Sequence, residues 1–176
     1  MNNRSDITKK TVFCALTLAA GLVLSYIESV LPINIGIPGA KIGLPNIVTL
    51  LLLYNCGTVP ALIVNIMRIL LSGFMFGNLF AILYSAFGLL FSMTAMVLLK
   101  KNGYFSIFGV SCIGGVMHNV GQLAAAAIVT NAYVFSYLPV LMLSGILSGL
   151  FVGAAGAELL KRLSPVIKKQ FGNIWN

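Results

Sequence analysis

Long apolar runs separated by short polar connectors set the pattern of this chain. The runs are continuous and do not alternate apolar with polar residues, so helices are predicted and membrane strands are not. One helical span of a bilayer needs about 20 apolar residues. The second and third runs are shorter than that. The predicted helices cover residues 11–31, 45–55, 59–72, 79–99, 106–130 and 137–163.

Polar segments frame these runs at both ends of the chain. Residues 1–10 and 164–176 are predicted to be cytoplasmic tails on either side of a six-helix bundle at 11–163. The connector from Pro32 to Leu44 is rich in proline and glycine and carries one lysine. Pro45 follows it, where the start of the second helix tolerates a proline. A single membrane domain over residues 1–176 accounts for the whole pattern.

Composition supports the same class of protein. Of the 176 residues, 59% are hydrophobic and only 8% are charged, whereas soluble domains have about a quarter charged residues. The chain is therefore predicted to be an all-α integral membrane protein in a lipid bilayer. A net charge of +8 in a soluble protein would suggest a nucleic-acid partner. Here the basic residues lie at helix ends, so no nucleic acid is expected.

Charge also orients the bundle. Six spans place both termini on one side of the membrane, and most basic residues fall on that side. They are Arg4, Lys9, Lys10, Lys100, Lys101, Lys161, Arg162, Lys168 and Lys169. The positive-inside rule makes that side the cytoplasm. Orientation leaves two basic residues unexplained, Lys41 in the external connector and Arg68 in the outer part of the third helix.

Polar side chains in the outer half of the bundle predict a binding pocket. Charged groups within a membrane are costly and usually face a cavity or a partner. On the fifth helix, Gln122 lies three positions after Asn119 and four after His118, so these polar residues share a broad face. Small-molecule sites combine apolar walls with a few placed polar groups. The predicted substrate-binding residues are Lys41, Asn46, Arg68, Asn78, His118, Asn119 and Gln122.

Each of these residues has a structural alternative. Arg68 can form a structural ion pair with Glu28 near the outer end of the first helix. The polar cluster of the fifth helix can form hydrogen bonds between helices. Lys41 can be a solvated loop charge, and Asn46 can be a cap at a helix end. The prediction of a pocket depends on the joint occurrence of polar groups in four separate segments.

Small residues recur on two helices. Ala15 and Ala19 form an A-x-x-x-A face on the first helix, which permits a close approach of another helix. The sixth helix carries a small residue at every fourth position, at Gly145, Gly149, Gly153 and Ala157. Internal packing explains the stripe on the sixth helix. The pair on the first helix can instead dock another membrane subunit.

The chain lacks the usual sequence signals of an enzyme. A prenyl diphosphate synthase needs clustered aspartates that hold Mg²⁺, but only three acidic residues are present. The sequence has no P-loop and no G-x-S-x-G, so the chain cannot hydrolyse ATP by itself. Isolated cysteines argue against a metal site or disulfides. They are Cys14, Cys56 and Cys112. No catalytic residue, metal ligand or cofactor is predicted.

Several segments closely resemble one bacterial family. These are residues 38–50, 68–79 and 109–122, joined by Tyr137–Leu141 and Ser144–Ile146. The family is labelled heptaprenyl diphosphate synthase component I and is also called the Gx transporter family. The resemblance covers nearly the whole chain.

That family is in turn similar to the substrate-binding S components of energy-coupling factor (ECF) transporters. These are six-helix proteins of the bacterial cell membrane that capture a vitamin or a related compound from outside. The resemblance implies a transmembrane T component and two cytoplasmic ATPases as partners. It also implies that Ala15 and Ala19 contact the T component, and that the connector at 32–44 gates the pocket.

Two functions follow from these observations. The preferred one is an S-component-like, substrate-binding subunit of an ATP-driven uptake transporter. Two cationic groups and one glutamate suggest a ligand with a polar or anionic part. The alternative is a non-catalytic membrane subunit of heptaprenyl diphosphate synthase in isoprenoid and menaquinone biosynthesis. The third hypothesis is a structural membrane scaffold, for which no small ligand is expected.

Overall fold

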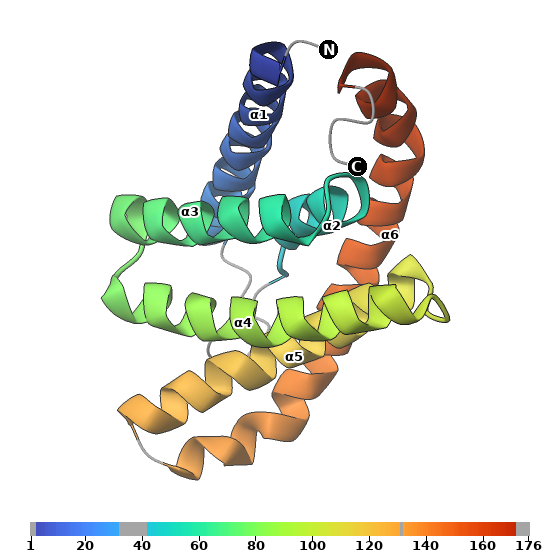
Figure 1. The fold of residues 1–176 in the computed structure, drawn as a ribbon. Helices are drawn as coiled ribbons and strands as arrows, with labels where there is room; N and C mark the ends of the chain where they lie inside the picture. The colour runs from blue at the N-terminus through green and yellow to red at the C-terminus, as the bar shows by residue number, and fades with distance from the viewer. Residues whose placement is uncertain (1–2, 32–41, 131, 172–176) are drawn as a thin grey trace.

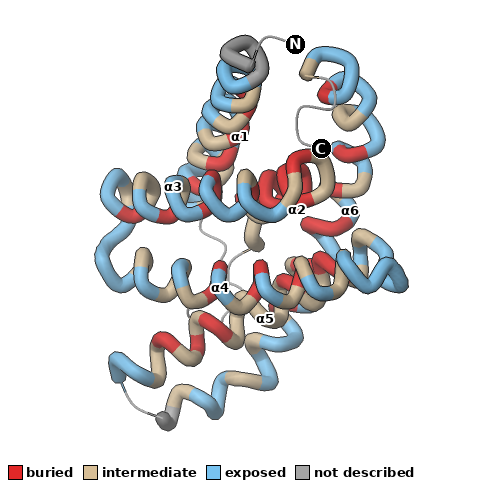
Figure 2. The backbone as a smooth tube through the Cα atoms, in the orientation of Figure 1, coloured by how far each residue is buried: buried red, intermediate tan, exposed pale blue. Residues whose placement is uncertain are grey.

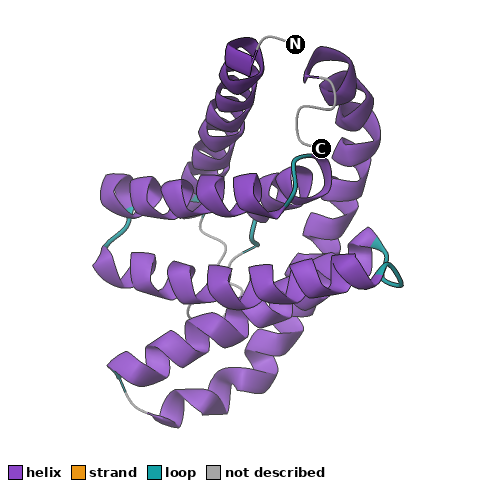
Figure 3. Ribbon diagram, viewed as in Figure 1, coloured by secondary structure: helices purple, strands orange, loops and turns teal. Residues whose placement is uncertain are grey.

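A computed structural model describes residues 3–31, 42–130 and 132–171. Helices make up nearly all of this part of the chain, which contains no strand, and the predicted all-α class is confirmed (Figure 3). The elements are α1 (Asn3–Val30), α2 (Asn46–Asn55), α3 (Thr58–Phe76), α4 (Leu79–Asn102), α5 (Ile107–Val129), the 3₁₀ helix η1 (Ala132–Tyr137) and α6 (Leu138–Phe171).

Five of the helices are long and apolar enough to cross a membrane, namely α1, α3, α4, α5 and α6. The remaining helix, α2, has 10 residues and a length of about 15 Å. The hydrocarbon core of a bilayer is about 30 Å thick. The chain is thus a multi-pass helical membrane protein with five candidate spans and one short helix, where six helices of the bundle were predicted to be transmembrane.

The short helix α2 lies at the centre of the packing. All seven residues from Ile47 to Leu53 are buried, and Figure 2 shows this continuous buried segment in red. Leu50, Leu52 and Leu53 are at most 1% exposed. A helix that is apolar on every side is stable only when every side is covered. The predicted short second helix is confirmed, and its uniform apolarity explains its position.

The third helix is longer than its sequence pattern predicted. The predicted helix covers residues 59–72, but α3 continues to Phe76 and reaches 19 residues. A Cβ atom at Gly73 would lie 2.1 Å from Cγ1 of Ile82, so this glycine allows α3 and α4 to pack closely. The helix ends at Gly77, whose N–H donates to the carbonyl of Gly73 at 3.2 Å. The prediction that the third helix is shorter than a full span is wrong.

The two ends of the chain are also more helical than predicted. Residues 3–10 belong to α1, and α6 continues through Pro165 to Phe171. Figure 1 shows the start of α1 and the end of α6 at the same end of the molecule. The rings of Phe13 and Phe171 meet there edge to face, with centroids 5.0 Å apart. This contact gives the last turns of α6 a packing partner, so residues 164–171 are not a simple tail.

Glycines bring α4, α5 and α6 together almost backbone to backbone. A Cβ atom at Gly149 of α6 would lie 2.6 Å from Cα of Cys112 in α5. On the other side of α5, a Cβ atom at Gly121 would lie 2.5 Å from the carbonyl oxygen of Phe87 in α4. Both distances are too short for any side chain. The glycine stripe of the sixth helix therefore packs inside the protein, as predicted.

Candidate ligand-binding site

A polar cavity of about 140 Å³ lies among the helices. Its lining includes residues from all six α-helices and from the segment Gly43–Pro45, which leads into α2. For comparison, an apolar cavity of about 150 Å³ in another protein holds one benzene molecule. The cavity therefore has the size of a small ligand.

Arg68 is the cation of this cavity, and contacts from three helices hold it in place. Its Nη1 donates to Oγ of Ser25 in α1 at 3.1 Å, and its Nε donates to Oδ1 of Asn65 at 3.3 Å. Asn65 is 1% exposed. The same Oδ1 also accepts a hydrogen bond from Thr49 of α2 at 2.9 Å. The guanidinium is consequently fixed by α1 and α2 as well as by its own helix.

The guanidinium retains unused donors. Arginine has five N–H donors, and the two hydrogen bonds above leave three without a partner in the described ranges. Glu28 lines the same cavity, but its carboxylate accepts a hydrogen bond from the backbone N–H of Gly43. Within those ranges, the one ion pair shorter than 4.0 Å joins Arg162 and Glu158. The alternative of a direct Arg68–Glu28 ion pair is not observed.

The polar residues of α5 line the opposite side of the cavity. Asn119 donates through Nδ2 to the carbonyl of Leu141 in α6 at 2.7 Å, so it does form a hydrogen bond between helices. The amide of Gln122 has no hydrogen-bond partner in the part of the chain described. His118 packs on α4, because a Cβ atom at Gly88 would lie 2.6 Å from its ring. One face of α5 thus combines a structural contact with a free amide.

The remaining predicted residues differ in whether they line the cavity. Asn46, the first residue of α2, lines the cavity, and its side chain does not cap the helix. Asn78 is exposed and does not line it. Instead, Oδ1 of Asn78 caps α4 by accepting a hydrogen bond from the N–H of Ala81 at 2.8 Å. Lys41 lies outside the described residues. The predicted residues that line the cavity are Asn46, Arg68, His118, Asn119 and Gln122.

Serine hydroxyls form a part of the site that the sequence reasoning missed. They are Ser25, Ser29, Ser72, Ser85 and Ser148. The search for intramembrane charges and amides overlooked them, although a periodic signal exists. Ser25 and Ser29 are four residues apart and flank Glu28, so one face of α1 is polar near its end. That face opens onto the cavity.

The chemistry of the lining fits binding better than metal chemistry. Within the described ranges, no group of three or more His, Cys, Asp or Glu side chains is placed to hold a metal ion. The described residues of its lining contribute one guanidinium, one carboxylate and many neutral hydrogen-bonding groups. Electrostatic attraction between charges inside a protein is stronger than in water. The arrangement can hold and orient a small polar molecule.

The small-residue pair on α1 lies on an exposed face. Ala15 and Ala19 are both exposed, and Leu16 between them is 62% exposed. Helix α3 covers a different side of α1, where Gly21 contacts the side chain of Arg68. This face therefore has no partner among the described parts of the chain.

These features define a multi-pass α-helical membrane protein with a polar internal cavity. Residues 17–159 match the family described as heptaprenyl diphosphate synthase component I, and the chain belongs to that family. No curated protein and no solved structure gives a significant match. The family recognised in the sequence is thereby confirmed.

Proposed function

We propose that this protein is the substrate-binding subunit of an ATP-driven uptake transporter, similar to an S component of an ECF transporter. Its substrate is a small vitamin- or cofactor-related molecule with a polar or anionic part. The observation that carries the proposal is Arg68, a guanidinium on a cavity of about 140 Å³ with three N–H donors that have no partner among the described residues.

A cation in this position needs a counter-charge. A charged group within a membrane is costly unless a partner or water compensates it. No carboxylate lies within 4.0 Å of Arg68 in the described ranges. Glu28 lines the same cavity and attracts the guanidinium from a longer distance, but in those ranges it accepts no hydrogen bond from Arg68. An anionic ligand would satisfy the remaining donors with charge-assisted hydrogen bonds. Asn46, His118, Asn119 and Gln122 line the same space and would orient it.

The transport machinery comes from partner proteins in this proposal. The start of α1 and the end of α6 lie at the same end of the molecule (Figure 1), which supports placing both termini in the cytoplasm of a bacterial cell. The single membrane domain binds the substrate from outside. A transmembrane T component docks on the face that carries Ala15 and Ala19, and two cytoplasmic ATPases supply the energy. The exposure of that face on α1 supports this assignment. Lys41 and Asn78 stay candidate substrate contacts from the sequence alone.

Binding measurements on the purified protein test the pocket. Native mass spectrometry identifies the small molecule that the protein retains, and the affinity for that molecule is then measured for three variants. Arg68→Ala and His118→Ala are expected to weaken binding at least about tenfold, because each removes a polar contact to the ligand. Arg162→Ala changes an exposed arginine and is expected to bind normally. If Arg68→Ala and His118→Ala both retain full affinity, the pocket is assigned wrongly.

The family description supports a second candidate function. A component I of heptaprenyl diphosphate synthase would be a non-catalytic membrane subunit that assists a separate synthase. Co-purification from the native membrane discriminates between the two candidates. A T component with two ATPases supports uptake, whereas an aspartate-rich soluble synthase supports the second function. Purification without partner or ligand would favour a structural scaffold.

A further inference from the structure

We infer that the ligand of this cavity is a compact molecule that carries an anionic group together with several hydroxyl or amino groups, and that it places no long apolar tail inside the cavity. The inference rests on the proposed function and specifies its substrate class. Three properties of the cavity support it: its volume, its unused donors, and the direction of its serine hydroxyl bonds.

The volume limits the size of the ligand. A cavity of about 140 Å³ is close to the one that holds a single benzene molecule, which has six non-hydrogen atoms, so the part of a ligand inside it has on the order of six to ten non-hydrogen atoms. A chain of several isoprene units exceeds this limit. Among the described residues, the apolar side chains of the lining are also few: Pro45, Ile69, Phe76 and Ala81. An apolar tail would therefore cover polar groups without giving them hydrogen bonds, which is costly.

Three residues that line the cavity offer hydrogen-bond donors to an anion. Arg68 offers three unused N–H groups, and the amides of Asn46 and Gln122 make no hydrogen bond with the described part of the chain. All three residues line the cavity from different helices, α3, α2 and α5. A planar guanidinium binds a carboxylate or a phosphate through two parallel hydrogen bonds. These groups define the anionic end of the ligand.

The serines define the other end of the ligand, because most of their protons are already used. Four of the lining hydroxyls donate to a carbonyl of their own helix at 2.7–3.3 Å: Ser25, Ser29, Ser72 and Ser148. A hydroxyl has one proton and two acceptor sites. Ser25 uses an acceptor site for Arg68, so the other three present acceptors to the cavity.

Acceptors require donors on the ligand. The carboxylate of Glu28 adds to the three serine acceptors, and within the described ranges it accepts one hydrogen bond, from the N–H of Gly43. An anion without hydroxyl or amino groups would leave these acceptors unpaired, and each unpaired buried polar group weakens binding. The complementary ligand therefore combines an anion with donors, as a hydroxylated phosphate or an amino acid does.

The first test identifies what the protein retains. The full chain is purified in mild detergent and denatured, and the released small molecules are analysed by mass spectrometry. A retained anion of about six to ten non-hydrogen atoms with hydroxyl or amino groups supports the inference. A retained prenyl chain overturns the inference and leaves the proposed function intact. Absence of any retained molecule, together with absence of binding in the second test, overturns both.

The second test uses four probes and measures their affinities by calorimetry: glycerol 3-phosphate, n-propyl phosphate, glycerol and geranyl diphosphate. We expect glycerol 3-phosphate to bind at least about tenfold more tightly than n-propyl phosphate, since two additional hydroxyls meet serine acceptors. Glycerol should bind weakest because it lacks the anion. If geranyl diphosphate binds more tightly than glycerol 3-phosphate, the cavity accepts an apolar tail and the inference is wrong.

Variants of the protein test separately the residues that bind the anionic end of the ligand and those that bind its hydroxyl groups. Arg68→Gln is expected to weaken both phosphates about tenfold to a hundredfold. Ser72→Ala should weaken glycerol 3-phosphate alone and leave n-propyl phosphate unchanged, a difference that misfolding cannot produce. Thr94→Ala is the matched control, because Thr94 also bonds to its own helix at 2.7 Å but is exposed and lies outside the cavity lining. Equal losses for both phosphates in Ser72→Ala would contradict the assignment of acceptors.

Discussion

The helices are held together by different kinds of contact within the two halves of the molecule. One half consists of α4, α5 and α6 (the glycine-packed half), and the other consists of α1, α2 and α3 (the polar half). In α4, α5 and α6, glycines bring backbones together, and a Cβ atom at Gly115 would lie 2.4 Å from the carbonyl oxygen of Gly145. In α1, α2 and α3, an apolar core is joined by hydrogen bonds between helices, from Arg68 to Ser25 and from Thr49 to Asn65. Figure 1 shows α1, α2 and α3 in the upper part of the view and α4 and α5 in the lower part, with α6 along one side.

This difference gives the two halves different roles: the glycine-packed half is a rigid support, whereas the polar half uses the same side chains for packing and for ligand binding. Backbone contacts between glycines leave few side chains to rearrange, so α5 presents His118, Asn119 and Gln122 on a firm support. In the other half, Arg68 both joins α3 to α1 and lines the cavity. A ligand that binds Arg68 therefore also acts on the contacts that hold α1 in place. Ligand binding should stabilise the α1–α3 half more than the α4–α6 half.

The largest expected effect comes from a bulky residue in the glycine-packed half. Gly149→Val would place a Cβ atom 2.6 Å from Cα of Cys112 and 2.7 Å from the carbonyl oxygen of Ser111. Neither backbone atom can move without displacing α5, so a loss of about 3 kcal/mol in the free energy of unfolding is expected. Denaturant titration in detergent measures this loss. Ala154→Val, on the exposed face of the same helix, should lose less than about 0.5 kcal/mol.

In the polar half, the largest loss of stability is expected from a substitution of Asn65. Asn65→Ala removes the acceptor of both Thr49 and Arg68 and the donor to the Ala61 carbonyl. A loss of about 2 kcal/mol is expected, because buried partners remain without hydrogen bonds. Unfolding titrations measure it, with the exposed Asn102→Ala as the control. Ligand affinity should fall as well, since Arg68 loses one of its supports. A stable Asn65→Ala protein would show that this network contributes little.

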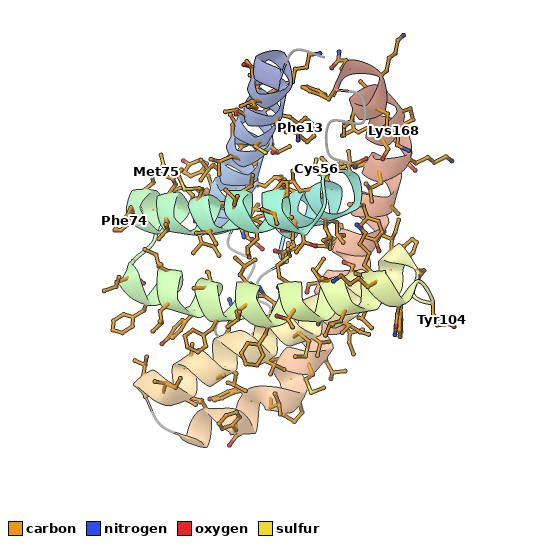
Figure 4. All side chains as sticks on the ribbon, in the orientation of Figure 1. Phe13, Cys56, Phe74, Met75, Tyr104 and Lys168 are labelled. Carbon is orange, nitrogen blue, oxygen red and sulfur yellow. The ribbon has the colours of Figure 1, made fainter. Side chains whose placement is uncertain are left out.

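The packing rules of the two halves also explain how much of the fold the sequence could predict. Long apolar runs indicated helices, and the four-residue spacing of Gly145, Gly149 and Gly153 indicated close packing. The role of Gly73 could not be predicted, because a glycine before Phe74 and Gly77 suits a turn as well as a helix contact. Only the position of Ile82 against Gly73 decides between them. Figure 4 shows Phe74 and Met75 on the last turns of α3, at the end away from Cys56.

The site was predictable where its residues are unusual in a membrane helix. Arg68, His118 and Gln122 stand out against apolar neighbours, and all three line the cavity. Serines do not stand out, because a serine on a membrane helix commonly bonds to its own backbone. Asn78 could not be assigned for the opposite reason. An asparagine before a helix stands out in the sequence, but it can cap the helix whether or not a ligand is near. Three-dimensional contacts are needed to separate these cases.

A smaller effect is expected at a direct link between the two halves. Lys100 of α4 donates to the carbonyl of Leu53 in α2 at 2.5 Å, and its Nζ lies 5.0 Å from the ring centre of Tyr54. Lys100→Met keeps the length of the side chain but removes both interactions, so a loss of about 1 kcal/mol is expected. The adjacent Lys101→Met changes an exposed lysine and should have no measurable effect. Equal stability of the two variants would mean that Lys100 does not join the halves.

The smallest expected effect tests whether a single hydrogen bond between helices matters in the polar half. Thr49→Val has nearly the same shape and removes only the donor to Oδ1 of Asn65, which still accepts from Arg68. Such bonds in membrane proteins contribute about 0.6 kcal/mol on average, and a loss of that size is expected in unfolding titrations. Thr94→Val, exposed on α4, should lose nothing. A loss at Thr49→Val as large as that at Asn65→Ala would mean that the position of Arg68 depends on α2, and that the three helices of this half form one coupled unit around the cavity.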